Sequence, residues 1–331
     1  MSDVPKEKLK LLFNDLLNGF CSTIYKNKTI NIKHLTHFDV ADFDLKYSVH
    51  FEEAKRQGAQ TVKEREQYLI TEGSWSAEKD KDIQNNQLFV SGLRDTKAKL
   101  FRQSEIDKIN NSIAESEKKI RDLENEKNQL LQYTAESFAN KKITEYQIFR
   151  SLFYNNQPFF TEEEYEQLTD NDLAEISVIY NEKFAHFNER TFRRIAISNF
   201  FLNSFYLCKD NPFTFYGKAV MQLTLFQIEV FSHAVYFKHL LNHAPSKPPQ
   251  EIMEDPDKLV DWSNANNSVK KVLESGKKPE DLVGLSGKDR ETLGLKTPNN
   301  NIHNKLIDAA KAKGSALTAT EIMKLQGVSY Q

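Results

Sequence analysis

The chain has 331 residues, enough for two domains or for one domain with an extension. Hydrophobic residues make up 39% and charged residues 28%, while Gly and Pro number only 11 and 9. This composition disfavours β-sandwiches, barrels and low-complexity disorder, and it favours long helices. The formal net charge of −2 provides no global positive field to attract nucleic acid or acidic membranes, although a local basic patch stays open.

Residues 1–73 are predicted to form an N-terminal α(+β) region. Leucines spaced along residues 5–18 predict a short amphipathic helix that ends at Gly19. Ile30 and Ile32 then alternate with polar residues, and the Asn27-Lys28 step favours a turn. A small β-hairpin is therefore expected here, and it is the one clear strand signal in the sequence.

Two helix starts follow the predicted hairpin. Thr36 with Asp39, and Thr61 with Glu64, have the spacing of a capping box, in which each side chain bonds the other residue's backbone N–H. The first helix is expected to end at Gly58. No signal peptide precedes these elements, which favours an intracellular protein.

Residues 74–133 carry the most regular pattern. Helices over residues 76–101 and 104–133, joined by a short turn, predict a protruding antiparallel coiled-coil hairpin roughly 35–40 Å long. Its second helix has an apolar stripe at heptad spacing, interrupted by Ser116 and Lys127. The stripe consists of Ile106, Ile109, Ile113, Ile120, Leu123 and Leu130. The hairpin is either a solvated spacer, which we favour, or a partner-binding arm.

Residues 134–243 are rich in aromatic side chains and are predicted to form the main helical core. The segment 219–241 reads as a helix that is apolar nearly all round, yet it is too polar to span a membrane. Cys21 and Cys208 lie in neither a CxxC pair nor a metal-ligand spacing, so we expect two small buried hydrophobic residues.

Residues 244–331 are predicted to be a linker and an extended C-terminal tail. Asp255-Pro256 starts a short helix that carries Trp262, and residues 263–301 read as loosely ordered. Two further short helices are expected, one over residues 304–313 and one capped by Thr318.

No linear motif for catalysis, phosphate binding or metal binding is present, so we predict no catalytic residue, no cofactor and no metal. His34 with His37, and His239 with His243, have spacings that can hold a metal. Ordinary core or surface histidines are the favoured interpretation of both pairs.

The residues 210–218 form the most distinctive loop. Its aromatic side chains either fill the core where two helices meet, which we favour, or stack on a base or a peptide. We nominate as tentative partner-binding residues the three aromatics of this loop and the two tryptophans. They are Phe213, Phe215, Tyr216, Trp75 and Trp262.

Two segments resemble a known family. Residues 24–39, IYKNKTINIKHLTHFD, resemble the N-terminal region of tail-assembly and baseplate-hub assembly proteins of T4-like tailed phages. Residues 249–262, PQEIMEDPDKLVDW, are similar to the short helical endings of tail-assembly chaperones. The resemblance implies a non-enzymatic structural or assembly role, with other tail or virion proteins as partners and homo-oligomers left open. It also implies residence in the host cytoplasm during assembly, with retention in the virion left open.

Two alternatives remain at this stage. A nucleic-acid-associated protein could use the hairpin to hold a duplex, although the acidic residues along the hairpin disfavour nucleic acid as a partner. An enzyme without a linear motif would need dispersed Asp and His side chains to meet in a cleft.

Overall fold

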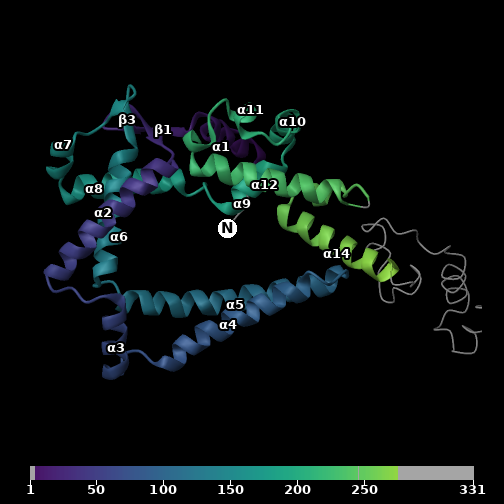
Figure 1. Ribbon diagram of the computed structural model, residues 1–331, viewed down its shortest axis with the longest axis horizontal. Coiled ribbons are helices and arrows are strands. Elements are labelled where there is room, and N and C mark those ends of the chain that lie inside the picture. Colours follow the sequence, from purple (N-terminus) through teal and green to yellow (C-terminus); the bar gives the residue numbers. More distant parts are fainter. Residues whose placement is uncertain (1–3, 245, 275–331) are drawn as a thin grey trace, which may run out of the picture.

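The structure is a computed structural model that describes residues 4–244 and 246–274 (Figure 1). Over these residues the chain is mainly α-helical, with a small antiparallel sheet built around an N-terminal β-hairpin. The predicted fold class is confirmed at this level.

The N-terminal region begins with α1 (Lys6–Asn18), which ends at Gly19 in the left-handed conformation that glycine adopts without strain. Strands β1 (Phe20–Tyr25) and β2 (Lys28–Lys33) form the predicted hairpin. Lys26 and Asn27 both have positive φ, which defines a two-residue type I′ turn. The turn therefore lies one residue earlier than the sequence suggested.

Two short strands extend this sheet, and the sequence analysis missed them. β3 (Leu152–Tyr154) pairs with β2, and β4 (Gln157–Pro158) pairs with β3 through a turn at Asn155-Asn156. The sheet order is β1-β2-β3-β4. β3 continues directly from a helix and is too short to show an alternating pattern, so only its pairing with β2 reveals it.

Helices α2 (His37–Arg56) and α6 (Ala135–Ser151) pack against each other below the sheet (Figure 1). The predicted capping box opens α2, because the Asp39 carboxylate accepts the Thr36 backbone N–H at 2.8 Å. The box formed by Thr61 and Glu64 likewise opens α3 (Val62–Glu72).

Helices α4 (Ala77–Lys97) and α5 (Gln103–Leu130) run antiparallel, as the ion pair between Arg94 and Glu117 at 2.8 Å reflects. Their connection does not stand free. Near it, Lys97 pairs with Asp261 at 2.8 Å, and the Ser268 hydroxyl donates to the Ala98 carbonyl. A protruding coiled coil is thus not confirmed, since the end of the hairpin contacts a helix 164 residues further along the chain (Figure 1).

The C-terminal half contains helices α7 to α14 and the short 3-10 helix η1. Their bounds are α7 (Glu162–Glu166), α8 (Asp170–Phe184), α9 (Glu189–Ile197), α10 (Asn199–Leu207), α11 (Pro212–Tyr216), η1 (Val220–Gln222), α12 (Leu225–Asn242), α13 (Gln250–Met253) and α14 (Pro256–Glu274). The predicted helix over residues 219–241 begins only at Leu225, because Thr224 and Gln227 form a capping box there.

Two hydrophobic clusters organise the molecule. The first, called here the aromatic core, is formed by α1, α9, α10, α12 and α14. The second lies between the sheet, α6 and α8. The buried Gln227 side chain ties α12 to α1 by donating to the Leu16 carbonyl at 2.7 Å.

Helix α14 corrects the prediction for the C-terminal tail. Residues 263–274, which the sequence suggested to be loosely ordered, continue the helix that carries Trp262. Asn266 bonds its own helix through the Trp262 carbonyl, and Leu259 and Val269 are buried, so packing overrides the weak helix propensity of asparagine. The predicted helices over residues 304–313 and at Thr318 lie outside the described residues.

Candidate functional site

The five nominated partner-binding residues differ in how far they are exposed. Trp75 and Trp262 are only 3% and 4% exposed, so the structure gives both a packing role. Phe215 and Tyr216 are partly buried against the aromatic core. Phe213 is the member of the set that lies at the surface, with 60% of its area exposed.

The loop over residues 210–218 is in fact the short helix α11 with its flanking turns. The Asn211 side chain caps it by accepting the Phe213 backbone N–H at 2.9 Å. The Phe215 ring packs 5.0 Å from that of Phe201, and the Tyr216 hydroxyl donates to the Gln227 carbonyl at 3.1 Å. The favoured interpretation, that aromatic side chains fill the core between two helices, holds for Phe215 and Tyr216 but not for Phe213.

Phe213 belongs to a short stretch of exposed apolar side chains, called here the 206–221 segment. This segment runs from the end of α10 through α11 to η1. Leu207 is 83% exposed, and the other exposed apolar members are Tyr206, Phe213, Val220 and Met221. Isolated exposed apolar residues are common, but several within one short stretch are typical of an interaction surface.

An ion pair fixes the connection between α10 and α11. The Lys238 ammonium contacts both oxygens of the Asp210 carboxylate, at 2.8 and 2.9 Å. The same ammonium lies 5.7 Å from the centre of the Tyr206 ring. Lys209 and Asp210 both have positive φ, so the chain reverses sharply between Leu207 and Phe213. The apolar side chains on both sides of this turn are therefore presented by an ordered element.

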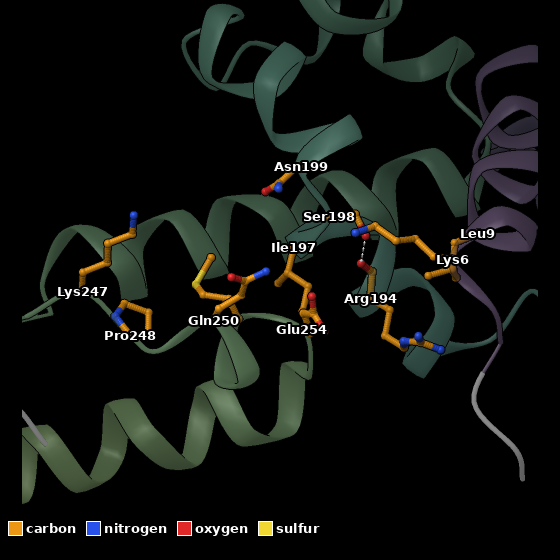
Figure 2. Close-up of a pocket in the computed structure, with 11 residues that line it drawn as sticks. Lys6, Leu9, Arg194, Ile197, Ser198, Asn199, Lys247, Pro248, Gln250 and Glu254 are labelled. Carbon is orange, nitrogen blue, oxygen red and sulfur yellow. Dashed lines mark hydrogen bonds between the residues drawn. The ribbon is translucent and has the colours of Figure 1, made fainter. Parts of the chain in front are cut away.

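A pocket of about 600 Å³ lies at the other end of α10, between the start of α1, the α9–α10 junction and α13. Figure 2 shows the Lys6 side chain reaching toward Ser198, with Lys247 on the opposite side of Ile197. The Arg194 guanidinium turns away from the pocket and donates to the Val4 carbonyl at 2.8 Å.

The Ser198 hydroxyl of this pocket is already engaged, because it donates to the Arg194 carbonyl at 2.7 Å. The lining combines cationic side chains with Glu254, so the charges are mixed rather than directed at one ligand.

The histidines of the two pairs considered as metal ligands have different surroundings. His34 is fully buried between the rings of Phe184, Phe187 and Phe226, and burial lowers its pKa to about 4. The ring centres of His239 and His243 lie 4.1 Å apart near the end of α12, with the rings tilted by 35°. Among the residues that the structure describes, no group of three His, Cys, Asp or Glu side chains is arranged to hold a metal ion.

Cys21 and Cys208 are both buried and unpaired, as expected of small core residues. Burial raises the pKa of the Cys21 thiol to about 12, so the reactive thiolate is suppressed. The Cys208 thiol donates to the Phe205 carbonyl at 2.9 Å within the core.

The described residues thus define a mainly α-helical protein with a small antiparallel sheet and an exposed apolar segment. Within residues 4–244 and 246–274, no helix combines the length and the apolar character that crossing a membrane requires. Comparisons with known protein families, with curated proteins and with solved structures find no match to this chain.

Proposed function

We propose that the protein is a non-enzymatic structural or assembly protein of a phage tail or baseplate, acting through contacts with other tail or virion proteins. The resemblance of residues 24–39 and 249–262 to tail-assembly proteins gives the biological context. The observation that carries a protein-binding role is the 206–221 segment. In this proposal the protein acts in the host cytoplasm while tails are being built.

The 206–221 segment supports this role on energetic grounds. Fully burying a Leu or Phe side chain contributes roughly 1.5–3 kcal/mol, and Leu207 and Phe213 have most of that gain still available in the isolated chain. A few such anchors commonly carry most of the energy of a protein–protein interface. The turn held by Lys238 and Asp210 limits the entropy lost when these anchors are buried.

The α4–α5 hairpin is assigned the role of a spacer. Ion pairs cover its surface, including those of Lys79 with Glu126 and of Arg94 with Glu117. Exposed ion pairs provide little binding energy, so a solvated spacer fits this surface better than a partner-binding arm. We also propose that α4 and α5 pack against each other as a coiled coil.

The proposal is tested by replacing both anchors, Leu207→Lys with Phe213→Lys, and isolating the tagged protein from its native host during tail assembly. Quantitative mass spectrometry should find tail or virion proteins with the wild type, and about a tenfold loss with the double variant. The thermal midpoint should stay within a few degrees of the wild type, because both side chains are exposed.

A control replaces two other exposed apolar residues, Leu11→Lys with Val178→Lys, which are 64% and 56% exposed. This control should retain the partners. Equal recovery of partners by the two double variants would remove the 206–221 segment from the proposal. Recovery of no tail or virion protein by the wild type would remove the phage role itself.

A further inference from the structure

A cleft of about 520 Å³ opens at the end of the sheet where both hairpin turns lie. Because β2 and β3 are antiparallel, the Lys26-Asn27 turn and the Asn155-Asn156 turn reach the same end of the sheet. This sheet-end cleft is lined by residues of both turns and of the chain after β4. In Figure 1 the strand β3, which leads into one of these turns, lies at the edge of the molecule and far from α14.

Aromatic rings form most of the apolar surface of the sheet-end cleft. Tyr25 packs edge-on against Phe159 at 5.7 Å, and Phe159 packs edge-on against Phe160 at 4.7 Å. Tyr154 stands at the opening and is 39% exposed. Such rings offer faces on which a planar ligand can stack.

The hydroxyl of Tyr25 lies within the wall of the cleft and is not open to a ligand. Tyr25 is 1% exposed, and its hydroxyl has less than 1 Å² of accessible surface. The pKa of Lys26 is raised by its hydrogen bonds to Asp172 and to Tyr25, so the hydroxyl lies beside that ammonium. Recognition of a ligand in the cleft therefore falls to the more exposed groups of its lining.

The charges around the cleft leave one lysine for an anion. Lys26 is paired with Asp172 at 2.8 Å, and Glu164 uses its carboxylate to accept the Thr161 backbone N–H in the cap of α7. Lys28 has no carboxylate within 4.0 Å among the described residues, and its ammonium lies 5.5 Å from the Tyr154 ring centre. The side-chain amides of Asn155 and Gln157 add neutral donors and acceptors.

We propose that the sheet-end cleft binds a nucleotide unit. The base stacks on the exposed ring of Tyr154, the side-chain amides of Asn155 and Gln157 offer bonds to an edge of the ligand, and Lys28 faces the phosphate. The same chemistry is presented by a free mononucleotide and by one unit of a single strand. This site is separate from the 206–221 segment and does not depend on the phage role.

Two probes distinguish these sources: adenosine monophosphate in calorimetric titration, and a fluorescent decathymidylate in anisotropy. Saturable binding is expected for at least one probe. Binding of the mononucleotide identifies a free nucleotide as the ligand, whereas binding of the oligonucleotide alone identifies a strand.

Two variants then place the bound probe. Tyr154→Ala should weaken binding about tenfold through loss of stacking. Lys28→Ala should weaken it several-fold and reduce its salt dependence.

The controls are Tyr133→Ala and Lys81→Ala, which change an exposed tyrosine and an exposed lysine away from the cleft. Both should bind as the wild type does. Absence of binding for both probes would overturn the proposal. Binding that persists unchanged in Tyr154→Ala and Lys28→Ala would overturn it as well, since the probe would then lie elsewhere.

Discussion

The aromatic core and the α4–α5 hairpin are both helical, yet they are stabilised in opposite ways. In the core, Phe201, Phe205 and Phe237 are completely buried, and ring contacts connect α10, α11 and α12. In the hairpin, only Val90, Ile106 and Ser116 are buried. Full burial of rings therefore stabilises the first region, whereas the second has half-buried apolar side chains along its length and ion pairs at its two ends.

Ion pairs at the two ends of the hairpin connect it to other helices. At one end, Lys127 pairs with Glu66 at 2.6 Å and with Asp80 at 2.9 Å, which connects α5 to α3 and α4. At the other end, Lys97 pairs with Asp261 of α14, whose side chain is only 10% exposed. A polar pair of helices can therefore keep a fixed place when charged groups anchor both of its ends.

The largest expected effect comes from the core. Phe205→Ala should lower the free energy of unfolding by about 3–5 kcal/mol, because it leaves a cavity among packed rings. Leu207→Ala, two residues along the same helix but 83% exposed, should change it by less than about 0.5 kcal/mol. Urea unfolding measures both. Similar losses for the two variants would contradict burial as the stabilising term.

His34 should make the core sensitive to acid. Its pKa is about 4 in the folded protein and about 6.5 in an unfolded chain, so the unfolded state binds the proton first as the pH falls. Stability present above pH 6.5 should decline by about 3 kcal/mol as the pH reaches 4, and this contribution changes little below that.

The comparison of wild type with His34→Phe isolates this effect, since the other titrating groups are common to both. As the pH falls from 7 to 4, the free energy of unfolding of the wild type should fall relative to that of His34→Phe. A difference that stays constant with pH would show that His34 does not titrate as its surroundings require.

Removing the ion pair at the end of the hairpin should increase local opening of the chain there. Lys97→Met leaves the Asp261 carboxylate without its cation, which we expect to weaken the hairpin–α14 contact by about 1–3 kcal/mol. Hydrogen exchange at the end of α4 and in α14 should accelerate about tenfold or more. Lys99→Met, an exposed lysine two residues away, serves as the control. Unchanged protection of α14 in the first variant would mean that the ion pair does not anchor the hairpin.

The smallest effect should come from the ion pairs along the hairpin. Arg94→Ala removes a pair whose arginine is 64% exposed, so it should cost about 0.2–1 kcal/mol and less at high salt. Thermal unfolding at two salt concentrations checks this. A salt-independent loss above this range would indicate packing by the arginine stem instead.

Local signals in the sequence predicted local structure well. The boxes formed by Thr36 with Asp39 and by Thr61 with Glu64 place the starts of α2 and α3, because each is complete within four residues. Capping geometry needs no information from the rest of the chain. The boundaries of the four predicted regions stay predictions, although α1 shares the aromatic core with α9 and α12.

The features that could not be predicted from the sequence depend on contacts between residues far apart in the chain. The pairing of β3 with β2 and the ion pair between Lys97 and Asp261 join residues more than a hundred positions apart. The candidate site shows the same limit. Phe213 and Phe215 lie two residues apart on a helix of five residues, so only the packing of α10 and α12 decides which of them faces outward.

The central claim is that the 206–221 segment contacts another protein of the tail. The most direct test introduces a photoreactive phenylalanine analogue at position 213. The control introduces it at position 133, because Tyr133 is also aromatic and is more exposed than Phe213. After illumination in the native host during tail assembly, we predict a covalent adduct with a tail or virion protein from position 213 and none from position 133. No adduct from position 213, or the same adduct from both positions, would contradict the claim.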